Sequence, residues 1–323
     1  MFGLERMVWG KMWREKGVGC FAIMVLVILL PCVITLLIGQ EAAMPVSGEA
    51  NSGVGQIRLE ENGQRIDLQE YLIGVTAAQL QGDVGVEAIK AQMILNRTYY
   101  YSILGSRNDL SGAELELDYL PPAKREARWV GAGIEDAKER FLQAAVETEG
   151  LVMTCQRQLA VGMYHHISSG RTRDLSDDYP YIHSVASEQD LLAPNYLTVV
   201  EYSRQALRNA LSGLCAAEIT DDVLQTGLQI LEKDGAGYVQ KLLVGTEICE
   251  GRRFAEALGL PSPAFSFQWP DSGLLRIVCR GQGHGYGLSQ YGAACMAKEG
   301  MTASEILNYY FKNVVIETWK KGE

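Results

Sequence analysis

The segment Gly281–Ala293, with the sequence GQGHGYGLSQYGA, has a glycine at every second position from Gly281 to Gly287. Successive side chains of an extended strand point to opposite faces of the backbone. The spacing therefore predicts a strand with side chains on one face and bare backbone on the other. The face with side chains would carry Gln282, His284, Tyr286 and Leu288. Such a strand can lie very close to a ligand or to another chain segment.

An uncharged apolar run occupies residues 17–39. Its length and its Val, Ile and Leu content suit a helix of about 20 residues that spans a bilayer. Four basic residues precede the run and the first charge after it is Glu41. The positive-inside rule then predicts a cytoplasmic tail over residues 1–16 and an extracytoplasmic location for the rest. A cleaved signal peptide is the alternative, although its apolar core is usually shorter, about 7 to 15 residues.

Residues 40–55 are small and polar, which predicts a flexible linker between the membrane and a folded domain. We expect the domain over residues 56–317 and a short tail over 318–323. Beyond residue 40 the chain has 25 basic and 37 acidic residues, because four of the 29 basic and two of the 39 acidic residues precede residue 17. This negative balance argues against nucleic acid and anionic membrane surfaces as partners.

Helical and strand patterns are mixed along this domain, which predicts an α+β fold without the regular βαβ order of a doubly wound sheet. Helices are predicted over 68–80, 86–104 and 133–148, in most of 201–233, and after Thr302. Strands are predicted over 159–163, 181–185, 238–244, 265–269 and 274–278. Residues 108–128 have the composition of a loop.

Three segments carry a family resemblance. They are Tyr71–Tyr99 (YLIGVTAAQLQGDVGVEAIKAQMILNRTY), Tyr164–Thr172 (YHHISSGRT) and the glycine segment Gly281–Ala293. Together they resemble the stage II sporulation protein D and amidase-enhancer family of cell-wall proteins, over roughly residues 56–317. The characterised enzymes of that family are lytic transglycosylases. The resemblance implies peptidoglycan glycan strands as the ligand, and a cell-wall amidase and a small membrane protein as partners in sporulation-type engulfment.

Gln79 stands where the family pattern has its catalytic glutamate. It follows Leu68, Leu72 and Val75 on one helix face, so an amide closes an apolar stripe. Such an amide either caps its own helix or points into a shared cavity, and the resemblance favours the cavity. An amide has no proton to give near neutral pH, whereas acid–base assistance is worth about 10² to 10⁴ in rate. We therefore expect a glycan-binding relative with lost or reduced transglycosylase activity.

Two alternatives stay open. Asp83 follows the helix break at Gly82 and could replace the missing acid, which would make the chain an active lytic transglycosylase. Glu87 is the less suitable acid, because it stands three residues from Lys90 and is expected to pair with it. The other alternative is an activator that stimulates a partner amidase by protein contact and does not bind glycan.

Charge and resemblance indicate the remaining site residues. Lys90 and Arg97 lie two helical turns apart and share a face, so they could hold carboxylate or lactyl groups of a muramyl sugar. A solvated basic face is the alternative. The other candidates for glycan binding are His165, Arg171, His284, Ser289, Gln290 and Tyr291.

The cysteines and histidines do not form a metal pattern. Five cysteines lie beyond residue 40, an odd number without CxxC or another metal spacing. His165 and His166 are adjacent, but no cysteine occurs from Gln156 to Leu214 to complete a zinc site. The sequence thus predicts no metal and no cofactor.

Overall fold

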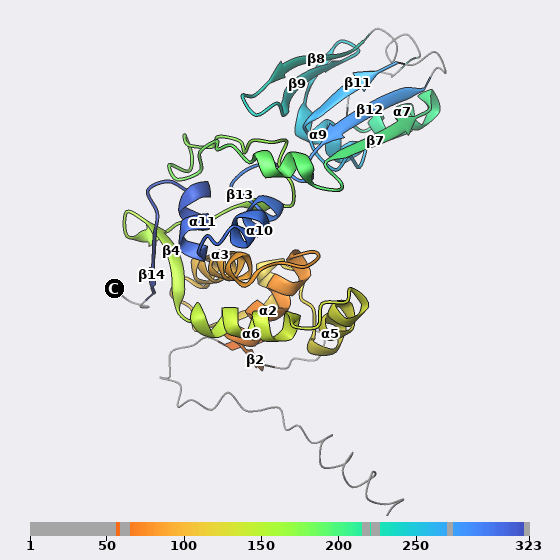
Figure 1. The fold of residues 1–323 in the computed structure, drawn as a ribbon. Coiled ribbons are helices and arrows are strands. Elements are labelled where there is room, and N and C mark those ends of the chain that lie inside the picture. Colours follow the sequence, from red (N-terminus) through yellow and green to blue (C-terminus); the bar gives the residue numbers. More distant parts are fainter. Residues whose placement is uncertain (1–55, 59–64, 215–219, 221–226, 270–273, 320–323) are drawn as a thin grey trace, which may run out of the picture. The chain divides into compact units, whose positions relative to one another are not determined.

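The computed structural model describes residues 56–58, 65–214, 220, 227–269 and 274–319 (Figure 1). The predicted cytoplasmic tail, membrane helix and linker lie outside these residues. Within the described ranges, no helix combines the length and apolarity needed to cross a bilayer. The described residues belong to one compact unit, Gly55–Glu323.

Helix α3 (Val86–Leu104) is the central element of the helical part of this unit (Figure 1). Side chains are buried around its whole circumference, which is typical of a helix enclosed by neighbours. The elements packed around it are α2 (Leu68–Gln79), α6 (Ala137–Glu147), α10 (Gln290–Lys298), α11 (Ala303–Tyr310) and strand β4 (Leu151–Cys155).

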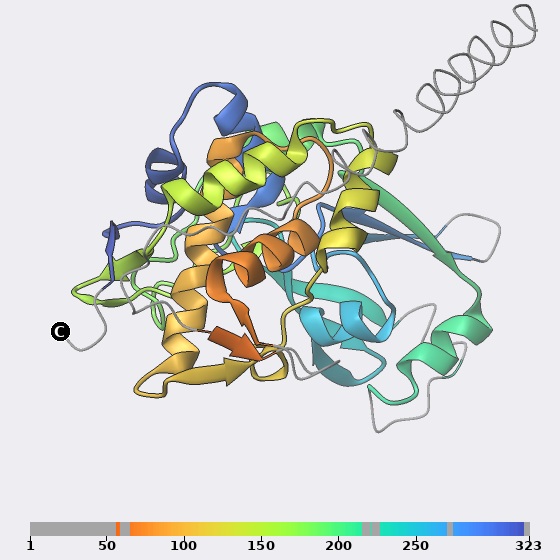
Figure 2. The same cartoon turned by 90° about the horizontal axis from the view of Figure 1, so that it is seen from below.

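Two small sheets border the helices. In one, β4 pairs with β14 (Val315–Thr318) and β5 (Gln158–Leu159). In the other, β1 (Gln56–Arg58) pairs with β2 (Arg65–Asp67) and β3 (Asp109–Ser111), and Figure 2 shows β2 leading directly into α2. The connecting elements are α4 (Gly112–Leu115), α5 (Pro122–Gly131) and the 3-10 helix η1 (Glu188–Leu192).

Two three-stranded sheets form the rest of the unit around a second apolar core that includes Phe254 and Phe265. The first has the order β10-β9-β8, with β8 at Leu228–Lys233, β9 at Val239–Val244 and β10 at Glu247–Glu250. The second has the order β11-β12-β7, with β7 at Leu197–Tyr202, β11 at Phe265–Gln268 and β12 at Leu275–Arg280. Helices α7 (Arg204–Leu211) and α9 (Gly251–Ala257) contribute Leu207, Leu211 and Phe254 to this core.

The α+β class is confirmed, and so are the helix over 86–104 and the capped helix after Thr302. Four assignments are wrong in whole or in part. Residues 108–128 contain β3, α4 and most of α5, and the range 201–233 ends in strand β8. Residues 181–185 form a loop, because Val185 exchanges hydrogen bonds with nearby Thr172 and no long partner strand lies alongside. Of the strand over 159–163, only Leu159 is retained, in β5.

The glycine segment is not a strand either. Gly281, Gly283, Gly285 and Gly287 have φ values from +69° to +103°, which side-chain-bearing residues rarely adopt. The chain therefore turns at every second residue. The expected close approach to another chain segment does occur, since a Cβ atom at Gly287 would lie 2.1 Å from the Met163 carbonyl oxygen. Only the next residues form a strand, β13 (Leu288–Ser289), which pairs in parallel with β6 (Tyr164–His165).

Two neutral histidines pack inside this turning segment. His165 Nδ1 donates to the Tyr286 carbonyl oxygen at 3.1 Å, and His284 Nδ1 accepts from the Tyr286 N–H at 3.0 Å. Burial lowers the pKa of His165 to about 3 and also lowers the pKa of His284. Both rings are therefore uncharged near pH 7 and contribute to holding the segment in place.

We expect the free energy of unfolding to decrease as the pH falls from about 6.5 toward 4. The unfolded chain binds protons at these histidines near their ordinary pKa of about 6.5, whereas the folded chain does not. Chemical denaturation across this pH range measures the effect. His165→Asn keeps a donor near the Nδ1 position and removes one titrating group, so its stability should decrease less over the same range. An identical pH dependence in wild type and variant would contradict the assignment.

Arg97 lies in the helical core and not on an accessible basic face. It is 0% exposed, and its guanidinium donates to Gln69 Oε1 at 2.8 Å and to the Leu151 carbonyl oxygen at 3.1 Å. Burial lowers its pKa to about 10, so the group is still charged near pH 7. The prediction that Arg97 lies on an accessible face is wrong, because α6 and the start of β4 cover that side of α3.

Arg97→Ala should lower the free energy of unfolding by about 3 kcal/mol, since it leaves a cavity and several unpaired buried acceptors. The matched control is Lys90→Ala on the same helix. Lys90 pairs with the partly exposed Glu87 and Glu147, so its loss should cost less. Denaturant titration compares the two, and equal losses would contradict the interior role of Arg97.

Candidate functional site

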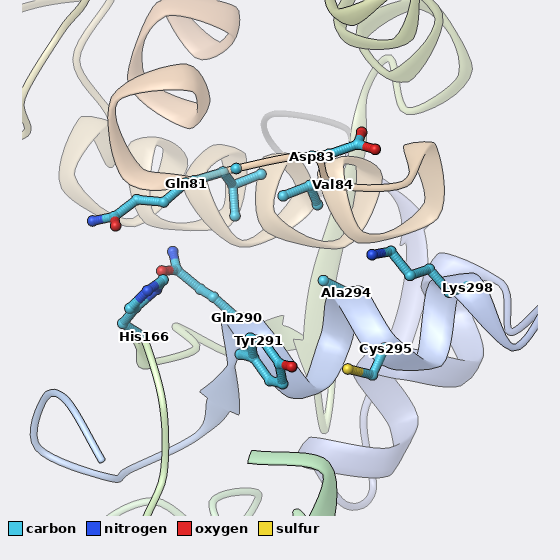
Figure 3. Close-up of a pocket in the computed structure, with 11 residues that line it drawn as sticks. Gln81, Asp83, Val84, His166, Gln290, Tyr291, Ala294, Cys295 and Lys298 are labelled. Atoms are coloured by element: carbon cyan, nitrogen blue, oxygen red, sulfur yellow. The ribbon is translucent and has the colours of Figure 1, made fainter. Parts of the chain in front are cut away.

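A pocket of about 250 Å³ opens between the turn that joins α2 to α3 and the start of α10 (Figure 3). Residues 80–84 form one wall. The facing wall consists of His166 and of α10 residues from Gln290 to Lys298.

Two arginines hold the turn 80–84 from behind. Arg128 donates to the carbonyl oxygens of Ala77 at 2.9 Å and Leu80 at 3.1 Å, which satisfies the C-terminal end of α2. Arg140 donates to the Val84 carbonyl oxygen at 2.6 Å and forms an ion pair with Asp83 at 2.7 Å. The turn is therefore a fixed wall of the pocket.

Gln79, the last residue of α2, is bound to the neighbouring helix α3 and not to its own backbone. Its Oε1 accepts from Gln92 Nε2 at 2.9 Å and from Asn96 Nδ2 at 2.8 Å. Its Nε2 is buried and has no hydrogen-bond partner among the described residues. Gln79 thus uses its acceptor inside the protein and retains a free donor.

Hydrogen bonds continue from Gln79 to the pocket. Gln92 Oε1 accepts from Gln290 Nε2 at 3.3 Å, and Gln290 lies beside His166 in the lining of the pocket (Figure 3). We call Gln79, Gln92 and Gln290 the amide row. The row joins α2, α3 and α10, and it links Gln79 through Gln92 to Gln290 in the wall of the pocket.

The ionisable groups at the pocket do not supply an acid. The carboxylate of Asp83 points away from His166 and Gln290 in Figure 3, toward its partner Arg140. Burial lowers the pKa of His166, and burial raises the pKa of the Cys295 thiol. Lys298 adds an ammonium group to the lining. Among the described residues, the pocket thus offers hydrogen bonds and one positive charge, without a carboxyl group directed inward.

A buried carboxylate supports the wall that carries His166. Asp190 accepts from the Ser168 N–H at 2.7 Å and from Ser289 Oγ at 2.9 Å. Ser289 is also the N-cap of α10, since its Oγ accepts from the Gly292 N–H at 3.2 Å. Asp190 therefore joins the segment after His166 to the start of α10. Sequence reasoning did not identify it.

Three of the site residues predicted from the sequence line the pocket: Asp83, Gln290 and Tyr291. A fourth, Gln79, is connected to it through the amide row. Four other candidates do not line it: Lys90, Arg97, His165 and His284. Ser289 and Arg171 do not line it either. Arg171 is exposed and donates to Ser184 Oγ at 3.4 Å. The expected pairing of Lys90 with Glu87 is confirmed at 2.5 Å.

Sequence reasoning missed several pocket residues: Gln81, His166 as a wall residue, Cys295 and Lys298. It also missed Gln92 and Asn96, although their spacing of four residues puts two amides on one helix face. Within the described ranges, no group of three or more His, Cys, Asp or Glu side chains is arranged to hold a metal ion.

Comparison with known proteins shows what this chain is similar to. The sequence profile of SpoIID, described as stage II sporulation protein, matches residues 60–155, which include Gln79 and the turn 80–84. Stage II sporulation protein D of Bacillus subtilis (strain 168) is 28% identical over 292 residues, covering 85% of this chain and 78% of the relative. The protein of the same name from Bacillus amyloliquefaciens is 26% identical over 266 residues, covering 78% and 75%. Residues 60–155 therefore match the SpoIID domain, and most of the chain is similar to stage II sporulation protein D of two Bacillus species.

Proposed function

We propose that this protein is a membrane-anchored cell-wall protein that binds peptidoglycan glycan strands at the pocket and has lost most or all lytic transglycosylase activity. One observation carries the proposal. The side chain at the position of the family's catalytic glutamate is the amide of Gln79, which Gln92 and Asn96 hold in place.

Cleavage of a glycosidic bond requires a group that gives a proton to the leaving oxygen. The Gln79 amide can donate a hydrogen bond through its free Nε2, but it does not release a proton near neutral pH. The amide therefore stands at the position of the acid without being able to perform the reaction. Binding would remain, and turnover would be lost.

Asp83 is poorly suited to replace the acid. Its carboxylate would first have to leave Arg140, at 2.7 Å, and then turn toward the pocket. The geometry therefore supports the binding protein over the relocated-acid enzyme.

The chemistry of the lining supports a sugar ligand. Gln81, Gln290 and His166 offer hydrogen bonds of the kind that sugar hydroxyl and acetamido groups make, and Lys298 could pair with a lactyl carboxylate. At about 250 Å³, the pocket is near the lower end of small-molecule sites, which start at about 300 Å³. It would hold a short part of a strand that continues outside.

The similarity to stage II sporulation protein D supports a role in sporulation, and we extend the proposal to engulfment, with a cell-wall amidase and a small membrane protein as partners. The uncharged run over residues 17–39 would anchor the protein, with the domain outside the cytoplasm. This arrangement would place the pocket on the side of the membrane where peptidoglycan lies.

Gln79→Glu should restore cleavage of peptide-free glycan, with anhydro-muramyl ends as the product. One carboxylate oxygen would accept from Gln92 and Asn96, and the other would occupy the buried position that Nε2 has now, where desolvation favours the protonated acid. Product ends are counted by mass spectrometry after incubation with the full-length protein in detergent. The rate should rise by about 10² or more over wild type.

Gln81→Glu is the matched control, because it adds a carboxyl group to the pocket at a different position. It should not give cleavage. If Gln79→Glu folds and binds glycan but does not cleave it, other parts of the catalytic site are missing as well. If wild type already cleaves and Asp83→Asn abolishes this, the relocated-acid enzyme is correct.

The proposed topology has its own test. Protease added to intact spheroplasts should digest the domain and leave only the membrane-embedded segment, because the basic residues before residue 17 keep that end in the cytoplasm. A protected domain would contradict the orientation. Release of a soluble form that begins near Ala43 would indicate a cleaved signal peptide.

A further inference from the structure

We propose that strand β7 is a dimerisation edge, which pairs antiparallel with β7 of a second copy of this chain about a twofold axis at Val199. β7 is the outer strand of the sheet β11-β12-β7 (Figure 1). None of its residues lines the pocket, so the inference is independent of glycan binding.

Alternate residues of β7 direct their backbone groups away from the sheet. β12 pairs with β7 along its whole length. Just before the strand, the Tyr196 carbonyl oxygen accepts from the Gly281 N–H at 2.7 Å, so the even-numbered residues of β7 make the hydrogen bonds to β12. The N–H and C=O groups of Leu197, Val199 and Glu201 therefore point outward, and no described residue pairs with them.

β7 lacks the features that protect the other edges. It is six residues long, without proline, lysine or a register shift in its pairing with β12. At the opposite edge of the sheet, Lys233 Nζ donates to the Phe265 carbonyl oxygen of β11 at 3.0 Å. β8, at the edge of the neighbouring sheet, has register shifts around Glu232. A regular, unprotected edge such as β7 is a template for a further strand.

The side chains on the outer face of β7 are apolar at its centre. Leu197 is 59% exposed and Val199 is 54% exposed. Val199 lies directly opposite Val278 of β12, which is half-buried. Glu201 forms an ion pair at 2.7 Å with Arg276, the residue opposite it on β12. The face therefore has an apolar centre and a charged pair at one end.

One twofold register uses every outward backbone group of β7. If Val199 faces Val199 of the second copy, Leu197 of each copy faces Glu201 of the other, and each facing pair exchanges two hydrogen bonds. A shift of the register in either direction leaves an outward residue of each strand without a facing residue in β7. The chosen register is symmetric about Val199, as the interface of a closed dimer must be.

The side chains are self-complementary in this register. Val278 and Val199 of both copies form a continuous apolar row across the two sheets. Beside that row, Glu201 of one copy faces Leu197 of the other, whose neighbour on β12 is the exposed Arg280. Glu201 and Arg280 are then two strands apart, about 10 Å, and their side chains can approach each other over Leu197. Opposite charges therefore meet on both sides of the apolar row, which favours a second copy of this chain as the partner.

Position 199 faces itself across the axis, which allows a charge-exchange test. Val199→Lys places two ammonium groups opposite each other, and Val199→Glu places two carboxylates, so each variant alone should dissociate more readily. An equal mixture of the two variants brings opposite charges together. The matched control is Ile248→Lys on edge strand β10, because Ile248 is also apolar and 65% exposed. Light scattering measures the molar mass of the full-length protein in detergent over a range of concentrations.

Wild type and Ile248→Lys should have the molar mass of two chains. Each Val199 variant alone should raise the dissociation constant of the dimer by about tenfold or more, and the mixture should return it toward the wild-type value. A wild type with the mass of one chain at every concentration would overturn the inference. So would Val199 variants that dimerise as well as wild type, or a mixture that dissociates as readily as its components.

A second measurement needs no variant. In hydrogen–deuterium exchange of wild type, the amides of Leu197, Val199 and Glu201 should exchange slowly at high protein concentration and faster on dilution. Fast exchange of these amides in a sample with the mass of two chains would place the interface elsewhere and overturn the inference. A failure to bind glycan would contradict the proposed function and leave the dimer unaffected.

Discussion

The hydrogen bonds from Gln92 and Asn96 to the Gln79 oxygen are the contacts on which the pocket depends. They attach the end of α2 to α3, the helix that its neighbours enclose on every side. Gln92 then binds Gln290 at the start of α10. Both walls of the pocket are therefore attached to the same helix, α3. Satisfied polar contacts of this kind inside a protein specify one arrangement, because breaking any of them leaves a buried group unpaired.

The same contacts define what the site can do. The amide oxygen of Gln79 accepts from both Gln92 and Asn96, so the arrangement of the pocket does not require an acid at this position. The amide itself does not release a proton. The carboxylate of Asp83, which lines the pocket, forms an ion pair with Arg140. The imidazole of His166 is neutral, because burial lowers its pKa. A pocket with this set of groups is suited to recognise neutral polar rings, and its one inward cation, Lys298, could recognise an acidic substituent on such a ring.

Local signals in the sequence were sufficient for the enclosed helix α3 and for the break at Gly82 that precedes it, because helical period and backbone conformation are properties of neighbouring residues. They were insufficient where contact with a distant segment determines the burial or the backbone conformation of a residue. The helical period correctly puts Arg97 on the same side as Lys90, but it cannot show that α6 covers Arg97. Alternating glycines fit a strand and a series of left-handed turns equally well, and the approach of Met163 selects the turns. The link between Gln92 and Gln290 also depends on a distant segment, because the two residues lie 198 positions apart in the chain.

The most direct measurement follows the wild-type protein and the glycan in one sample. Full-length protein is incubated with purified peptide-free strands, the bound fraction is isolated, and the chain lengths and end groups of that glycan are determined by mass spectrometry. We expect strands that are bound and unchanged in length, because Gln79 holds the site without donating a proton. Shortened strands with anhydro-muramyl ends would show that wild type cleaves, and would contradict the central claim.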